Sequence, residues 1–371
     1  MNPIRISLAG LALTCVALAP QSAPKAQAPA PSPASTPAPA AITPGMSGSA
    51  ALQGWYTPEV SEVVTRFPEY LAKTPAFEGT LRITGSNSMA GLLTKLASAY
   101  ESIYPGVKVV VKQGGSSKGI QALKAGECDM ASVSRALTEA EVKELEASTG
   151  LKVFQVPIAL DATCIYVNAD NPVAGITREQ LNGIFSITHS LTKNPIIRWS
   201  DLDKKSPLGD QFMPIYTLPE SHGTMQAFFE FAMSGEQLQT IMRFSEPGAS
   251  SVVNACCAYP TAMGISGYSN RQPRARAVPV AEGVGKPFVA PSFRTIRDRS
   301  YSMWRPMNLV VLAKDADQVS AMTQDFLQFT WSEAGQDACA TLGMVVVDID
   351  RAPELLKDSV QRRFTDKATA R

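Results

Sequence analysis

Two short loops rich in glycine and serine contain the residues of this sequence that are best suited to bind an anion. They are Gly85–Ser88 (GSNS) and Gly114–Ser117 (GGSS), and each stands between a short apolar run and a helical pattern. The first backbone N–H groups of a helix and serine hydroxyls donate hydrogen bonds to anions, and glycine allows the backbone to approach closely. One such loop is explained by helix capping alone, whereas two in succession favour a shared anion site.

Strands and helices must position these loops. Residues 81–83 and 107–111 predict strands, and residues 92–103 and those that follow Ser117 predict helices. Ligands of parallel α/β sheets bind at the carboxyl ends of the strands, so both loops are expected to face one small anion.

Two later segments add small polar residues after predicted strands. Residues 126–135 end a strand-like run with Ser132, Ser134 and Arg135, and residues 219–224 (PESHGT) precede a helix rich in phenylalanine. The rest of the chain continues the α/β pattern. Further helices are predicted at 138–148, 177–185, 250–259, 319–330 and 333–342, and further strands at 153–167, 214–218, 263–268, 307–313 and 345–347.

Composition limits the classes of protein to which the chain can belong. A chain of 371 residues with 45% hydrophobic residues can bury a large core, which is expected to form two lobes. The net charge of +1 favours neither nucleic acid nor a membrane surface as the main partner. The basic loop 271–276 (RQPRAR) lacks interleaved aromatic residues, so it is interpreted as a solvated loop or a transporter contact.

The first 78 residues predict three segments before the main fold. Residues 1–19 combine Arg5 with an apolar run too short to span a membrane, which is typical of a signal peptide for export to the periplasm or cell envelope. Cys15 is an alternative point for a lipid anchor. Residues 20–50 are rich in Ala and Pro and predict a disordered tether, and residues 51–78 predict an appended helix.

The cysteines predict structural disulfide bonds and no metal site. Five of the six lie outside the predicted signal peptide, and no CxxC pair or histidine spacing typical of zinc is present. Their pairing cannot be deduced from the sequence, and one free buried thiol is expected to remain. We expect no cofactor.

No catalytic constellation is evident either. The only histidines are His189 and His222, no GxSxG motif is present, and no Asp and His cluster suits a metallophosphatase. The chain is therefore expected not to be an enzyme. A phosphatase-like enzyme on the same fold stays an alternative, as does a receptor module that reports oxyanion occupancy to a sensor.

Eight motifs in order carry a resemblance to a known family. The motifs are GSxSM, GGSSxG, GExDMASxSR, VPIALDxxxIYVN, SxGTxxxFF, GISGY, RPMNLVV and SEAGQxxxxxLGMV, between Gly79 and Asp350. In this order the chain resembles the phosphate-binding proteins of Pst-type ATP-binding cassette importers. The resemblance implies a monomeric α/β protein with the two-lobed periplasmic-binding-protein fold of type II, which closes over a tetrahedral oxyanion and delivers it to the importer.

The resemblance also implies where the two lobes, the hinge strands and the C-terminal tail begin and end. Two hinge-crossing strands are expected near 159–163 and 304–308. Lobe I would comprise residues 79–161 and 306–350, lobe II residues 162–305, and a charged tail residues 351–371.

The family pattern, carried over residue by residue, implies a ligand site. The implied ligand-binding residues are Ser88, Met89, Ser116, Ser117, Ser134, Arg135, His222, Gly223 and Thr224. Ser88 would donate its hydroxyl and Met89 its backbone N–H, and Ser117 and Gly119 would shape the second loop.

The sequence departs from the family pattern at two positions. Leu218 stands where many members carry an arginine, and His222 where serine is usual. At Ser134 and Arg135 many members also have Ser-Arg, whereas others have an aspartate that accepts the proton of hydrogen phosphate. We expect Arg135 to supply charge and His222 to donate from one ring nitrogen. Without the aspartate, phosphate is expected to be distinguished less well from sulfate, so sulfate, arsenate or another oxyanion stays an alternative ligand.

Overall fold

The computed structural model describes residues 55–73 and 76–356. The predicted signal peptide, the tether, Cys15 and the tail beyond Leu356 lie outside the described residues. Within them, no helix has both the length and the apolar character needed to cross a membrane.

Most strands join one mixed sheet of nine. Its order is β2-β1-β3-β11-β4-β8-β6-β7, with β9 paired to β4, and β10 and β5 form a separate pair. The strands are β1 (Gly79–Gly85), β2 (Val107–Gln113), β3 (Met130–Val133), β4 (Lys152–Asn168), β5 (Ile176–Thr177), β6 (Ile215–Thr217), β7 (Arg243–Ser245), β8 (Met263–Gly267), β9 (Ala275–Ala277), β10 (Val280–Ala281) and β11 (Trp304–Ala313).

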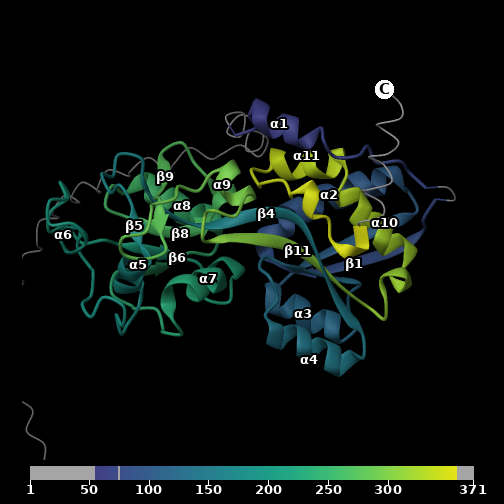
Figure 1. The fold of residues 1–371 in the computed structure, drawn as a ribbon, viewed down its shortest axis with the longest axis horizontal. Coiled ribbons are helices and arrows are strands. Elements are labelled where there is room, and N and C mark those ends of the chain that lie inside the picture. The colour runs from purple at the N-terminus through teal and green to yellow at the C-terminus, as the bar shows by residue number, and fades with distance from the viewer. Residues whose placement is uncertain (1–54, 74–75, 357–371) are drawn as a thin grey trace, which may run out of the picture. The chain divides into compact units, whose positions relative to one another are not determined.

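Helices cover both faces of this sheet. The α-helices are α1 (Pro58–Val64), α2 (Ala90–Ile103), α3 (Ser116–Lys124), α4 (Glu139–Thr149), α5 (Arg178–Phe185), α6 (Trp199–Leu202), α7 (Gly223–Phe228), α8 (Ala249–Ala258), α9 (Phe293–Arg297), α10 (Ala321–Thr330) and α11 (Glu333–Thr341). Around β1 and β11, α3 and α4 lie on one side, and α2, α10 and α11 on the other (Figure 1).

Two long strands connect two separate hydrophobic cores. β4 pairs with β11 up to Ala162 and with β8 from Thr163 onward, and Figure 1 shows β4 and β11 side by side between the two groups of helices. The residues of one core come from 67–159 and 307–356, and those of the other come from 160–303, with Val345 added. This arrangement agrees with the predicted fold class, while the lobe boundaries given above stay a prediction.

Two expectations about local structure were wrong. The helix of the appended segment covers only Pro58–Val64, capped by Thr57, because the chain reaches Pro68 four residues later and proline cannot donate a helical hydrogen bond. Residues 345–347 form no strand, since Val345 makes an isolated bridge with Leu160 and the Val347 N–H donates to the Gln336 side chain.

The expected disulfide bonds are also absent from the described part of the chain. All five cysteines there are free: Cys128, Cys164, Cys256, Cys257 and Cys339. Burial among apolar neighbours explains four of them, since unpaired cysteine packs as a small hydrophobic residue.

Candidate functional site

The first two predicted loops lie against each other at one end of the sheet. β1 is parallel to both β2 and β3, and Gly85 is in register with Gln113 and with Ser132. The N–H groups of Gly114 and Gly115 both donate to the Gly85 carbonyl, at 3.0 and 2.9 Å. Parallel pairing therefore brings the carboxyl ends of the three strands together, as the sequence predicted.

Ser116 and Ser134 form the buried centre of this region. Their Oγ atoms are 3.3 Å apart, and the Ser134 N–H donates to Ser116 Oγ at 3.2 Å. Neither side chain is exposed to solvent. Gly119, in the first turn of α3, allows this helix to approach β1, because a Cβ there would lie 2.6 Å from the Thr84 carbonyl oxygen. The structure thus brings two predicted hydroxyls together, 18 residues apart in sequence.

The fourth loop, between β6 and α7, reaches the same place. A Cβ added to Gly223 would lie 2.1 Å from Ser134 Oγ and 3.3 Å from Ser116 Oγ, and one added to Gly115 would lie 3.6 Å from the Ser221 carbonyl oxygen. Only glycine fits at 223 without a shift of its neighbours. The starts of two helices that pack into different cores, α3 through Ile120 and Leu123 and α7 through Met225 and Phe228, therefore meet at one point.

His222 caps helix α7 as a neutral ring. Its Nδ1 accepts a hydrogen bond from the Thr224 N–H at 3.3 Å, which places the ring proton on Nε2. Burial lowers the pKa of His222 from 6.5 to about 4, helped by the nearby positive charge of Arg305. The ring is half-buried, and its Nε2–H remains a possible donor, as the sequence analysis expected.

Thr224 carries a buried hydroxyl without a partner among the described residues. Its side chain is 0% exposed, and Oγ1 makes no hydrogen bond. Its carbonyl accepts from Thr163 Oγ1 on β4 at 3.2 Å. A buried donor left unpaired is costly, so this hydroxyl suits a ligand that would accept from it.

Arg135 lies beside these loops, but its guanidinium group is engaged within the protein. Nη1 and Nη2 each lie 2.7 Å from an oxygen of Glu141, and Nε donates to Gln226 of α7 at 3.1 Å. The two charges stabilise each other, raising the pKa of Arg135 and lowering that of Glu141. Glu141 was not predicted as a partner of Arg135.

The remaining predicted residues differ in exposure. Met89 is buried at the start of α2, and Ser117 is exposed. Ser88 lines a cavity of about 440 Å³ with His222, and the start of α8 (Ser250 and Ser251) lines the same cavity. These α8 serines were not among the predicted site residues, although serines in a first helical turn are the same kind of signal.

A buried ion pair beside the site was also missed. Arg305 Nη2 lies 2.7 Å from Asp161 Oδ2, and the two side chains are 2% and 1% exposed. Both residues stand inside motifs that the sequence analysis quoted, but nothing local to either motif indicates that they face each other.

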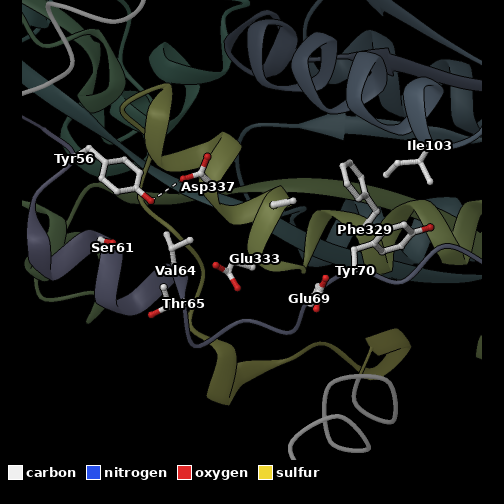
Figure 2. A pocket seen from close by; sticks show the side chains of 11 residues that line it. Tyr56, Ser61, Val64, Thr65, Glu69, Tyr70, Ile103, Phe329, Glu333 and Asp337 are labelled. Atoms are coloured by element: carbon white, nitrogen blue, oxygen red, sulfur yellow. Dashed lines mark hydrogen bonds between the residues drawn. The ribbon is translucent and has the colours of Figure 1, made fainter. Parts of the chain in front are cut away.

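A larger cavity of the described chain, about 710 Å³, lies elsewhere. It is bounded by α1 and α11, where Tyr56 donates to Asp337, with Phe329 and Tyr70 at its other end (Figure 2). None of the predicted ligand-binding residues lines it. Among the residues that the structure describes, no group of three or more His, Cys, Asp or Glu side chains could hold a metal ion.

Comparison with known proteins agrees with this architecture. The Phosphate-binding protein PstS of Pseudomonas aeruginosa is 26% identical over 300 residues, covering 81% of this chain and 92% of the relative. Its counterpart in Staphylococcus epidermidis is 27% identical, covering 70% and 77%. The crystal structure of an ABC-type phosphate transport receptor from Vibrio cholerae is 25% identical, with a TM-score of 0.58 over 72% of this chain and all of that one.

The family model described as the PBP superfamily domain matches residues 71–334, which is more than half of the chain. The predicted fold class is confirmed by the mixed sheet, by the strands β4 and β11 that connect the two cores, and by these structural relatives. This chain belongs to the PBP superfamily.

Proposed function

We propose that this chain is an exported solute-binding protein that captures phosphate, or a similar tetrahedral oxyanion, and delivers it to an ABC importer. Relatives named as phosphate-binding proteins, over most of their length and most of this chain, support the proposal. They also support a binding role rather than an enzymatic one. We further propose that the protein acts as a monomer in the periplasm or cell envelope, directed there by residues 1–19.

The observation that carries the proposal is the meeting of Ser116, Ser134 and Gly223. These residues come from three loops and leave no room for a side chain at position 223. A dehydrated tetrahedral anion needs several donors in place of water, and hydroxyls and N–H groups at helix starts provide them. The full set of donors would surround the anion only when the two predicted lobes close on each other. Lobe closure and anion capture would then be one event.

A role is proposed for each predicted residue. Ser88, Ser116, Ser134 and Thr224 would donate through hydroxyls, Met89 and Gly223 through backbone N–H groups, and His222 through Nε2–H. Ser117, whose side chain is exposed, would shape the second loop. We keep Arg135 in the proposed set, although most of its hydrogen-bonding capacity is used by Glu141 and Gln226.

Calorimetric titration of the full mature chain with phosphate, sulfate and arsenate tests the proposal. We expect micromolar or tighter binding of at least phosphate. Ser116→Ala should weaken it about tenfold or more, since a hydrogen bond to a charged group contributes roughly 1.5–3 kcal/mol. Ser98→Ala is the matched control, an exposed serine on α2 far along the helix from the site. No binding of any of the three anions by the wild-type chain would refute the proposed function.

A further inference from the structure

A doubly charged anion in a site without water is held more strongly when a positively charged donor joins the neutral ones, and this step rests on the proposed function. Arg135 is the positively charged residue that the sequence suggested, yet each of its three guanidinium nitrogens already donates within the protein, to Glu141 and to Gln226. Moving Arg135 toward a ligand would break that pair and leave Glu141 without its partner. A different cation close to Ser116 and Ser134 could supply this charge without breaking an existing pair.

Arg305 lies where such a cation is required. On β11 it stands directly opposite Asp161 of β4, in the segment where the two strands connect the two cores. Its Nη1 donates to the Ser134 carbonyl oxygen at 3.3 Å, so the guanidinium group lies against the same loop that presents Ser134 Oγ. The side chain is 2% exposed and thus shielded from solvent.

The hydrogen bonds of Arg305 do not use its Nε–H. Nη2 contacts Asp161, Nη1 contacts Ser134, and the buried Nε has no acceptor among the described residues. An unpaired N–H on a buried cation is costly, and native proteins tolerate it mainly where another partner completes it. The free donor and the charge are together what an oxyanion would use.

Asp161 fixes the orientation of this guanidinium group. Its Oδ2 contacts Arg305, and its Oδ1 accepts from the Ser269 N–H at 3.0 Å. Gly267 allows β8 to approach, because a Cβ there would lie 2.8 Å from Asp161 Oδ2 and 3.3 Å from Arg305 Nη2. Since a buried ion pair rarely adds net stability over apolar residues, its presence at this position calls for a functional reason.

The pair is also within electrostatic reach of the fourth loop. Arg305 lowers the pKa of His222, whereas Asp161 raises it. His222 lines the 440 Å³ cavity together with Ser88 and Ser269, the residue whose N–H holds Asp161.

We propose that Arg305, oriented by Asp161, is the cation of the anion site and donates through its free Nε–H to the bound oxyanion. The residue thus determines affinity for doubly charged tetrahedral anions. In this role it acts beside the hydroxyl and N–H donors and compensates for the engagement of Arg135 by Glu141.

The test is calorimetric titration of the full mature chain with phosphate and sulfate. Removing Arg305 alone would leave the Asp161 charge buried and threaten folding, so the main variant is Asp161→Asn with Arg305→Met, which removes both charges. Its control is Arg82→Met with Asp129→Asn, which removes both charges of another ion pair between residues distant in sequence, 2.8 Å apart and more exposed. Thermal unfolding with and without ligand confirms that each variant is folded.

We expect the Asp161/Arg305 double variant to fold and to bind both anions about 10- to 100-fold more weakly, as loss of a charge-assisted hydrogen bond implies, with the control unchanged. Arg305→Lys should keep more affinity than the double variant, because it retains the charge.

Wild-type affinity in the folded double variant would overturn the role of Arg305 while leaving the proposed function intact. If Arg305→Lys loses as much anion affinity as the double variant, the positive charge of Arg305 does not contribute to binding. The Asp161–Arg305 pair would then have only a structural role. If the wild-type chain binds neither anion nor arsenate, the proposed function itself fails, and this inference with it.

Discussion

Gly223 lies so close to Ser134 that a Cβ at position 223 would be 2.1 Å from the serine Oγ. The two residues belong to loops 89 positions apart (223 − 134 = 89), and neither loop by itself requires a glycine or a serine at this point. Their contact joins the end of β3 to the start of α7, so the spacing between these elements depends on the absence of a side chain.

Gly223→Ala is expected to lower anion affinity at least tenfold, because the new methyl group pushes α7 away from Ser134 and costs about 1–3 kcal/mol of overpacking. The main steric conflict is with this hydroxyl, since the new methyl group would lie 3.5 Å from Ser134 Cβ, an ordinary contact, and 3.3 Å from Ser116 Oγ, only slightly too close. In a Ser134→Ala background, Gly223→Ala should therefore have little further effect. A double-mutant cycle by calorimetry measures this coupling, and additive effects of the two changes would contradict the close contact.

Thr224→Val is expected to separate binding from stability. The Oγ1 hydroxyl is buried without a partner among the described residues, so its removal should leave the free energy of unfolding unchanged or raise it slightly. Anion affinity should nevertheless fall about tenfold, if this hydroxyl donates to the ligand.

Thr163→Val is the matched control for that change, because Thr163 Oγ1 does donate to the Thr224 carbonyl at 3.2 Å. This variant should lose about 1 kcal/mol in urea unfolding. A Thr224→Val protein that loses stability and keeps full affinity would show that the hydroxyl serves the fold.

Glu141→Gln is expected to destabilise the protein by roughly 2 kcal/mol, because it leaves the Arg135 charge, largely buried, without its carboxylate. Lys143→Gln is the control, since Lys143 and its partner Glu139 form an exposed pair on the same helix. Urea unfolding of both variants measures the difference. Equal stability of Glu141→Gln and wild type would mean that the ion pair with Arg135 contributes nothing.

His222 is expected to make stability fall as the solution becomes acidic. Its pKa is lowered to about 4 in the folded state, while the unfolded chain protonates near 6.5, so the unfolded state binds more protons between these values. The stability contributed by neutral His222 is thus full above about 6.5 and is lost as the pH falls toward 4.

The difference between wild type and His222→Gln isolates this effect. From about pH 7 to about pH 5, wild type should lose roughly 2 kcal/mol more than the variant in chemical unfolding. Parallel pH profiles of the two proteins would mean that His222 titrates normally and is not buried as a neutral cap.

The cysteines are expected to titrate as free thiols. In denaturant, a thiol reagent should detect five thiols in the mature chain, and electrophoretic mobility should not change on reduction. In the native protein Cys257 should react first, because it is only half-buried, whereas burial raises the pKa of Cys164, Cys256 and Cys339. Fewer than five thiols would reveal a disulfide bond.

Much of the local structure was predictable because it depends on neighbours in sequence. The β-branched run at 107–111 forms β2, Thr138 caps α4 through a capping box with Glu141, and residues 153–167 form one long strand. The two glycine–serine loops were identified for the same reason, since helix starts and tight turns have local chemical signatures.

Other features depended on residues distant in sequence. Whether Arg135 is free or paired depends on the rotation of α4, and the isolated bridge at Val345 depends on where Leu160 passes. The cysteines looked like disulfide partners by count, but pairing requires a proximity that only the packed core sets.

By itself, the sequence determined that helix starts with small polar residues follow several strands, because glycine, serine and β-branched residues impose their conformations locally. Only the tertiary structure decided that Gly223 meets Ser134 and that Arg305 stands opposite Asp161. The physical reason is that strand register and the packing of two cores, neither encoded within any one segment, fix which distant side chains share a buried space.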